Sequence, residues 1–405
     1  MSGNKKRYKL AIVSPTPFYY HIPLYQKLSK CPQIDLTVYY CSKEALTGKD
    51  VEAWYKSKGF MADEGELLKG YGYKFLKNYS LNPSFTNWLF GLVNFGIWRE
   101  IKKGEFDAVI LQAWNNFTWW LAFLACLGSK TPIYFMSDAN VLSEPLKPNW
   151  KKKIKNLVLK HFFFKKAAGF LAQGIVNKGF YEYYGVPGKK ILKMHYNYGF
   201  EWFLTKAEQL NPKREEIRQA FNLKKDDFVM LFVGRLSEEK NILDLLKAYE
   251  KSFYKNKKLF IAGDGPLRKQ IEKHIKDSGI KGVYLTGFQA REKICEFYAL
   301  ADAVLLASSR ETWGMVINEA MCFSLPIIAS NRVGSVADLV KNGYNGFIFS
   351  VGDVGKITEC MERVMRFSHE ERLIFGERSY DIINKWMEES DPVFTIIKIL
   401  KGTKK

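Results

Sequence analysis

The chain has 405 residues, of which 47% are hydrophobic and 26% are charged, and its formal net charge is +20. This length exceeds one ordinary core, and this composition excludes general disorder, so we expect two folded domains. So large a positive charge calls for an anionic partner, which can be nucleic acid, an acidic lipid surface or a phosphorylated substrate.

Cysteine usage and hydropathy indicate the compartment. The six cysteines are scattered, with no CxxC pair and no Cys/His cluster, which fits a reduced cytosolic protein without structural zinc. No secretory signal is visible, because the apolar run LAIV ends at SPTP. The longest apolar stretch, 117–127, is far shorter than the roughly 20 residues of a membrane helix. We therefore expect a cytoplasmic chain that does not span a bilayer.

Short apolar runs alternate with helical patterns along the first half of the chain. The run YKLAIVS at 8–14 is typical of a buried strand, and the helical segment IPLYQKLSK follows it. Further strands are expected at 34–40, 106–112, 131–137 and 167–173. This β-α-β alternation predicts a parallel sheet that helices cover on both faces.

A second series of the same kind begins after residue 220. Its strands are expected at 228–234, 258–265, 282–287, 302–309, 325–330 and 346–350. We predict an N-terminal domain at 1–199, a C-terminal domain at 200–385, and a C-terminal helix at 386–405 that returns to the first domain. The fold class is α/β, with two facing Rossmann-like domains whose strand ends border a ligand cleft.

The segment LFVGRLSEEKN, 231–241, places two cations at the end of a buried strand. Gly234 allows a sharp turn, and Arg235 and Lys240 follow it next to a helix start that favours anions. This arrangement suits a diphosphate. A solvated basic loop is the alternative.

The segment IAGDGPLRKQIE, 261–272, contains Gly263 and Gly265 in a tight turn, with a proline suited to the first helical position. It is not GxGxxG, and the chain has no Walker sequence, so a plain turn between strand and helix is the alternative.

The segment LLASSRETWGMVINEA, 305–320, places Glu311 beyond a strand end and Glu319 in the early turns of a helix. The amides of Trp313, Gly314 and Met315 lie near the expected helix start and can donate to phosphate oxygens. Carboxylates accept hydrogen bonds from paired sugar hydroxyls. The alternative leaves Glu319 to the helix dipole and Glu311 to solvent.

Residues 228–350 contain five motifs in chain order: G-R-x4-K, G-x-G-P, T-G-F, E-x7-E and GSVADLVKNGYNGFIF. Through these motifs the segment resembles the family 4 retaining glycosyltransferases, which have the GT-B architecture. The segments GVPGKKI and HYNYGF carry a looser resemblance in the first half. The resemblance implies transfer of a hexose from a nucleoside diphosphate sugar, UDP ahead of GDP, to a glycan or lipid-linked hydroxyl. Retention of configuration, no metal or other cofactor, and a place in polysaccharide, lipopolysaccharide or glycolipid synthesis are also implied.

The resemblance also implies residue roles. Arg235 and Lys240 bind the diphosphate and stabilise the leaving group, Glu311 lies near the sugar hydroxyls, and Glu319 holds the ribose. The remaining donor-binding positions are Gly234, Gly263, Gly265, Gly287, Phe288, Thr312, Trp313, Gly314, Met315 and Val316. No DxD tripeptide occurs, which fits metal independence.

The first half departs from the family pattern. Its first loop, SPTPFYYHIPLY, has no glycine, and its His21 either donates to the diphosphate or acceptor or is a hydrogen-bonded structural group. The region YFMSDANVLSE has no histidine. Its Asp138 either orients the acceptor or a sugar hydroxyl, or caps the next helix.

A basic amphipathic helix is expected within 146–166, with Trp150 on its apolar face and Lys151, Lys152 and Lys155 among its lysines. It suits an anionic membrane surface, and we expect peripheral association with the inner face of the membrane. A core helix with a solvated lysine face is the alternative.

Two other functions remain open. A sugar-nucleotide epimerase of GT-B type would use a similar cleft without an acceptor. A nucleic-acid-binding protein would fit the charge, but no recognisable nucleic-acid module is present.

Overall fold

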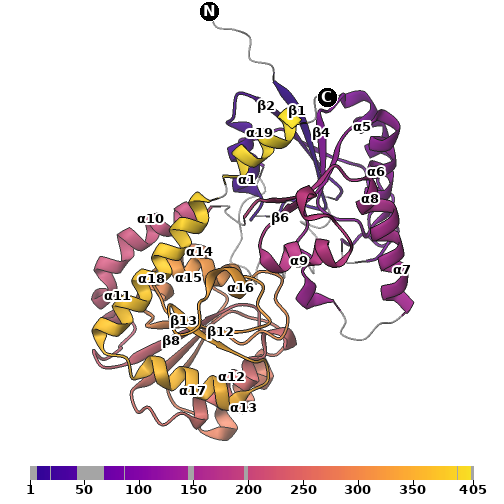
Figure 1. The fold of residues 1–405 in the computed structure, drawn as a ribbon. Coiled ribbons are helices and arrows are strands. Elements are labelled where there is room, and N and C mark those ends of the chain that lie inside the picture. Colours follow the sequence, from indigo (N-terminus) through magenta and orange to yellow (C-terminus); the bar gives the residue numbers. More distant parts are fainter. Residues whose placement is uncertain are drawn as a thin grey trace, which may run out of the picture. The chain divides into compact units, whose positions relative to one another are not determined.

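The computed structural model describes residues 7–18, 20–42, 68–85, 87–144, 150–195, 199–389 and 391–402. Among these the chain divides into two compact units (Figure 1). Unit 1 contains the described residues up to Gly199 together with those from Glu389 onward, and unit 2 contains Phe200–Glu388. Each unit is built around one parallel sheet.

The sheet of unit 1 has seven strands in the order β3-β2-β1-β4-β5-β6-β7. The strands are β1 (Tyr8–Ser14), β2 (Ile34–Tyr40), β3 (Tyr73–Phe75), β4 (Ala108–Leu111), β5 (Ile133–Phe135), β6 (Gly169–Ala172) and β7 (Ile191–Lys193). All pairs are parallel, and the strand order reverses between β1 and β4. That reversal is the topological switch point, beside which open α/β sheets bind ligands.

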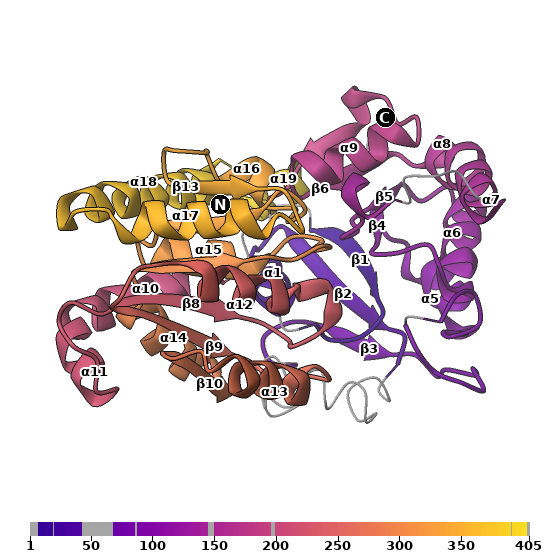
Figure 2. The ribbon, with the colours of Figure 1, turned by 90° about the horizontal axis from the view of Figure 1, so that it is seen from below.

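Helices cover both faces of this sheet (Figures 1 and 2). They are α1 (Ile22–Ser29), α5 (Gly96–Gly104), α6 (Phe117–Ser129), α7 (Trp150–Val158), α8 (Phe164–Lys166), α9 (Ile175–Tyr183) and α19 (Pro392–Gly402), with short 3-10 turns at Val141–Ser143 and Gly188–Lys190. A π-helical turn, Leu159–Phe163, joins α7 to α8. Ala11 and Val13 face the core beneath α5 and α6, while the intervening residues Leu10 and Ile12 are equally buried. Burial on both faces explains why β1 is apolar without alternation.

The sheet of unit 2 has six parallel strands in the order β10-β9-β8-β11-β12-β13. The strands are β8 (Phe228–Val233), β9 (Lys257–Ala262), β10 (Val283–Gly287), β11 (Ala303–Leu306), β12 (Ile327–Ser330) and β13 (Gly346–Phe349). Here the switch point lies between β8 and β11, which pair directly. Residues that follow β8 and β11 are therefore brought together at the carboxyl edge of the sheet.

The helices of unit 2 lie in two layers about this sheet (Figures 1 and 2). They are α10 (Phe200–Leu210), α11 (Arg214–Ala220), α12 (Ile242–Lys251), α13 (Arg268–Ser278), α14 (Arg291–Leu300), α15 (Met315–Cys322), α16 (Val336–Leu339), α17 (Val354–Met365) and α18 (His369–Glu388), with 3-10 turns at Asn211–Lys213 and Glu238–Lys240. Helix α12 packs against α17, and α15 packs against α18.

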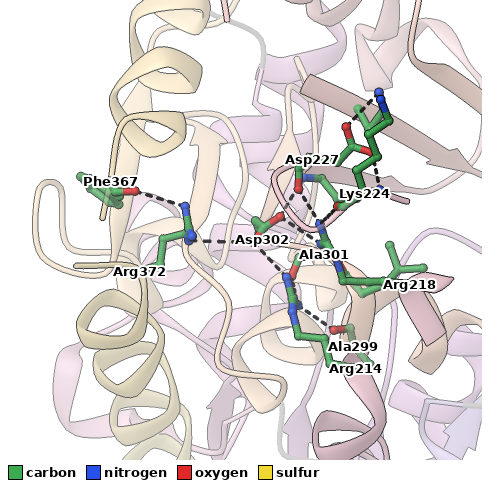
Figure 3. A network of polar contacts seen from close by, with 12 residues as sticks. Arg214, Arg218, Lys224, Asp227, Ala299, Ala301, Asp302, Phe367 and Arg372 are labelled. Atoms are coloured by element: carbon green, nitrogen blue, oxygen red, sulfur yellow. Dashed lines mark hydrogen bonds and ion pairs between the residues drawn. The ribbon is translucent and has the colours of Figure 1, made fainter. Parts of the chain in front are cut away.

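An ion-pair network ties α11 to the amino edge of the second sheet (Figure 3). Asp302, just before β11, accepts from Arg214 at 2.8 Å and from Arg218 at 3.3 Å. The same carboxylate accepts from the backbone amide of Val229 at 2.8 Å. Arg218 is buried, so its charge depends on these partners for compensation.

The α/β class and the two parallel sheets are confirmed, and every predicted strand is present with ends that differ by up to three residues. The sequence reading missed β3 and β7. Both are three-residue edge strands with a lysine in them, so they lack the apolar run of a buried strand. The residues after Glu388 group with unit 1, where Thr395 Oγ1 donates to the carbonyl of Lys193 at 3.3 Å.

Candidate functional site

Three loops meet at the carboxyl edge of the second sheet, and backbone hydrogen bonds fix them to one another. The amide of Gly234 donates to Ala262 at 3.0 Å, and the amide of Gly263 donates to Gly287 at 2.8 Å. Gly263 has φ +156°, and a Cβ there would lie 1.8 Å from the carbonyl oxygen of Gly234. Only glycine allows this approach, so the glycine pattern of these loops serves close contact between backbones.

Lys240 and Glu311 form an ion pair across the switch point of this sheet. Lys240 ends the turn after β8, and Glu311 lies in the loop after β11. Their side chains are only 11% and 18% exposed. The backbone holds the two loops in place, because the amide of Ser309 donates to the carbonyl of Glu239 at 2.8 Å. The structure therefore joins two of the predicted catalytic residues directly.

Arg235 is an exposed cation in the loop after β8. Within the described part of the chain its guanidinium makes no hydrogen bond or ion pair, so its donors are available to a ligand. Glu239 lies near it. Partial burial works to raise the pKa of Glu239, but the Ser237 hydroxyl and the positive charges of Lys240 and Arg235 outweigh that effect and hold the pKa below its usual value. The loop thus keeps ionised groups of both signs.

The loop from Glu311 to Gly314 leads into α15. The carbonyl of Glu311 accepts from Gly334 at 3.1 Å, and the carbonyl of Trp313 accepts from Ser335 at 2.8 Å. Gly314, at φ +91°, is the N-cap of α15, and a Cβ there would lie 2.7 Å from Val333. Thr312 is exposed, and Met315 and Val316 form the first turn of α15, where amides have no partner within the helix.

The side chain of Trp313 serves packing. It is 4% exposed, its ring stacks on Trp386 of α18 with centroids 5.4 Å apart, and its Nε1 donates to Asn318 at 2.9 Å. Only the backbone of Trp313 is therefore placed for ligand contact.

Glu319 lies on the second turn of α15 and accepts a hydrogen bond from the Tyr298 hydroxyl at 2.7 Å. Burial, together with the nearby Glu319 charge, raises the pKa of Tyr298 well above its usual value, so this hydroxyl stays neutral and donates. The sequence reading missed Tyr298. Its position in α14, 21 residues before Glu319, gives no local signal of the contact.

Other cations border these loops and were not predicted. Arg268 lies beside Gly287, where a Cβ would come 3.1 Å from its Nη1, and it pairs with Asp264 at 3.1 Å. Arg310 is exposed directly before Glu311, and the carbonyl of Arg332 accepts from the amide of Glu311 at 3.3 Å. The position of Arg310 immediately before Glu311 is the sequence signal that could have identified this arginine.

Two of the predicted donor-binding positions lie in the neighbouring loops. Gly265 approaches the backbone of Leu236, and Phe288 is partly buried at the end of β10.

In unit 1, His21 and Asp138 lie in loops at the carboxyl edge of the first sheet, after β1 and after β5. His21 is buried, and its Nδ1 lies 3.3 Å from the amide nitrogen of Gln112, which also donates to the Tyr25 hydroxyl at 2.9 Å. Burial lowers the pKa of His21 to about 4, against a smaller opposing effect of Asp138. His21 is therefore neutral at pH 7. The Tyr20 hydroxyl donates to Asp138 at 3.4 Å.

The predicted membrane-facing residues have mixed outcomes. The side chains of Trp150, Lys151 and Lys152 lie outside the described residues. Lys155 pairs with Glu144 at 2.5 Å and lies over the rings of Phe180 and Tyr184, so its charge is compensated inside unit 1. The expected helix is also interrupted before residue 166, because the π turn lies between α7 and α8. Phe163 and Phe164 are buried, whereas Leu157 is exposed.

Two negative findings hold for the described residues alone. No group of three or more His, Cys, Asp or Glu side chains there is placed to hold a metal ion. No helix among them combines the length and apolarity that crossing a bilayer requires.

Comparison with known proteins identifies relatives of this site. Residues 213–381 match the family model described as glycosyl transferases group 1. The chain is 33% identical over 150 residues to alpha-monoglucosyldiacylglycerol synthase of Acholeplasma laidlawii, covering 36% of this chain and 37% of that one. It is 31% identical over 188 residues to sulfoquinovosyl transferase SQD2 of Arabidopsis thaliana, covering 44% and 35%. The aligned parts thus span well under two thirds of these relatives.

The fold is shared with a solved structure from Anabaena, Alr3699/HepE in complex with UDP and glucose. The two chains superpose with a TM-score of 0.68 over 98% of this chain and 99% of the other, at 16% identity. This likeness identifies the architecture as GT-B.

Proposed function

We propose that the chain is a group 1 glycosyl transferase, because residues 213–381 match that family model, and that it moves a hexose from a nucleoside diphosphate sugar to a hydroxyl acceptor. UDP is the preferred nucleotide, with GDP second. The single observation that carries the proposal is the Lys240–Glu311 pair at the switch point, with the exposed Arg235 guanidinium in the same loop as Lys240. Two cations and the first turn of α15 suit a diphosphate.

The chemistry follows from charge. When the bond between the anomeric carbon and the diphosphate oxygen breaks, negative charge grows on the leaving phosphate. Arg235 and Lys240 stabilise that charge from fixed positions, and losing one such donor typically costs about 3 to 4 kcal/mol of barrier. We propose that no metal is needed, because these side chains supply the positive charge.

The remaining donor contacts divide between two carboxylates. Glu311, already held by Lys240, accepts from the sugar hydroxyls, and Glu319, held by Tyr298, accepts from the ribose hydroxyls. We propose retention of configuration: the acceptor oxygen attacks the anomeric carbon on the face that the diphosphate leaves, and a phosphate oxygen takes the hydroxyl proton.

In this proposal the acceptor binds to unit 1, where His21 and Asp138 contact it. His21 is neutral, which fits a hydrogen-bonding group rather than a fixed cation. The acceptor is proposed to be a glycan or a lipid-linked sugar at the cytoplasmic face of a membrane, in glycolipid, lipopolysaccharide or other surface polysaccharide synthesis. The glycolipid and sulfoquinovosyl activities in the names of two relatives support this class.

Calorimetry with UDP and GDP, followed by a screen of their sugar derivatives for slow hydrolysis, tests the proposal. We expect one diphosphate to bind in the wild type, and Arg235→Ala to weaken that binding. Absence of heat with both diphosphates at millimolar concentration would contradict it. Conversion of the free nucleotide sugar into its epimer, without release of the diphosphate, would favour the epimerase instead.

A further inference from the structure

The outer surface of α6 lacks the charged residues that an exposed helix usually has. Its sequence, FTWWLAFLACLGS, contains no ionisable side chain other than a cysteine. Leu124 and Leu127 are nevertheless 39% and 38% exposed. A surface helix of a globular protein normally presents polar residues to water, so an outward face made of leucine indicates a partner.

The apolar surface continues onto both neighbours of α6, and Figures 1 and 2 show α5, α6 and α7 along the same side of unit 1. On the α5 side, a Cβ at Gly128 would lie 3.6 Å from Cε of Lys102, whose ammonium lies over the ring of Trp98. Phe95, which caps α5, contacts Phe117 at the start of α6, with ring centroids 6.0 Å apart.

On the other side, Trp120 of α6 stacks on Phe162 of the π turn, with centroids 6.1 Å apart. Leu157, one turn earlier, is 63% exposed. We call the exposed apolar side chains on these neighbouring elements the apolar strip: Phe95, Trp98, Leu124, Leu127, Leu157 and Phe162. All six side chains are exposed, and they come from α5 with its N-cap, α6, α7 and the π turn.

Positive charge borders the strip. Neither 117–129 nor 150–166 contains an aspartate or glutamate. In α5 the single Glu100 pairs with Lys74 at 2.8 Å, so it does not offset the rim. The exposed cations on or next to these elements are Arg99, Lys102, Lys103, Lys130, Lys160 and Lys165, against one exposed carboxylate, Glu105, which follows α5.

We infer that the apolar strip is the surface by which unit 1 lies on an anionic lipid bilayer, with the exposed lysines at the level of the headgroups. Leucine, tryptophan and phenylalanine need no hydrogen-bond partners in the acyl region, and lysine stems extend along apolar surface while their charges reach the phosphates. A second copy is a poor occupant, because its identical rim would oppose lysine to lysine. The inference deepens the proposed membrane association: it rests on α5, α6 and the π turn, whereas Lys155 is paired internally.

Vesicle sedimentation tests this surface. The wild type is expected to sediment with vesicles of phosphatidylcholine and phosphatidylglycerol, and much less with phosphatidylcholine alone. Leu124→Glu/Leu127→Glu should reduce binding at least tenfold, because both positions lose the apolar surface that would enter the acyl region and gain a charge. The matched control is Leu373→Glu/Ile374→Glu, two residues that are 52% and 38% exposed on α18 of unit 2, with the same change in charge.

A second variant keeps the test decisive if the first does not fold. Lys102→Gln/Lys103→Gln removes two rim cations and leaves the apolar residues intact; it should weaken binding about fivefold or more at low salt and little at high salt. The inference is overturned if both strip variants bind as the wild type does. It is also overturned if the control loses as much, or if the wild type is a dimer that Leu124→Glu/Leu127→Glu separates while vesicle binding persists. UDP calorimetry on the same variants distinguishes a failure of this inference from a failure of the proposed function, because these substitutions should not change diphosphate binding.

Discussion

Lys240 and Glu311, 71 positions apart in the chain, bind each other at the point where the strand order of the second sheet reverses. Each follows one of the two strands, β8 and β11, that flank the reversal. The pair holds the loop after β11 against the cationic loop after β8. The diphosphate and the sugar of a donor are therefore expected to meet at this pair.

Replacing Lys240 by alanine should affect both turnover and stability. We expect kcat for transfer to fall about 10²- to 10³-fold, because one stabilising donor is lost. The free energy of unfolding should fall by roughly 1 to 3 kcal/mol, since the mostly buried Glu311 carboxylate loses the Lys240 ammonium. Urea unfolding and steady-state kinetics measure these effects. In Lys240→Ala/Glu311→Gln the stability losses should be less than additive; strict additivity would show that the pair has no interaction energy.

Arg235→Ala should behave differently, because Arg235 is exposed and has no protein partner among the described residues. Its stability should stay within about 0.5 kcal/mol of the wild type. Its affinity for the donor diphosphate, measured by calorimetry, should fall roughly 10- to 100-fold, as expected for a hydrogen bond between charged groups. Arg366→Ala removes an arginine from a surface pair with Glu362 and is the control. Equal losses in both variants would point to a nonspecific charge effect.

Tyr298→Phe should separate donor binding from turnover. Without the hydroxyl, Glu319 is no longer held at 2.7 Å, so the KM for the nucleotide sugar should rise about five- to tenfold while kcat changes little. Tyr249→Phe is the matched control, because its hydroxyl also donates within unit 2, to the carbonyl of Lys257 at the amino edge of the sheet. A fall in kcat with unchanged KM would assign Glu319 to the chemical step instead.

Asp302→Asn should destabilise unit 2 without changing donor affinity. The substitution leaves Arg218, which is buried, with one carboxylate fewer, and breaking a buried pair costs about 3 to 5 kcal/mol. Thermal unfolding should show the loss, and UDP affinity at 20 °C should be retained because Asp302 lies at the opposite edge of the sheet from Lys240. Unchanged thermal stability would mean that hydrogen bonding to the asparagine suffices.

His21 should make stability depend on pH. Burial keeps its pKa near 4 in the folded chain, whereas the unfolded residue titrates at its ordinary value of 6.5. Between these values the unfolded state binds more protons, so the free energy of unfolding should fall by about 3 kcal/mol in total as pH drops from 6.5 to 4. Above pH 6.5 His21 should contribute no slope. His21→Asn should lack this component, and an identical pH profile in both proteins would contradict the burial effect.

Local patterns sufficed for much of this protein. Apolar runs of four to seven residues between helical segments predicted the buried strands, because burial on both faces leaves no room for polar side chains. Glycines after β8 and β9, Arg235 and Lys240 after the first of them, and Glu311 beyond β11 identified the second sheet's carboxyl edge as the candidate site. The short edge strands β3 and β7 were not predicted, because each is three residues long and contains a lysine, so neither has an apolar run.

Only the tertiary structure determined which residues from distant segments contact each other. Tyr298 meets Glu319, Trp313 stacks on Trp386, and Lys155 turns to Glu144 because neighbouring helices and loops bring them together. A single π turn, which amphipathic spacing does not reveal, changes which side chains of α7 and α8 reach the core. Spacing along one element is a local property of the sequence, whereas contact depends on which elements become neighbours, and sheet order and helix register determine that.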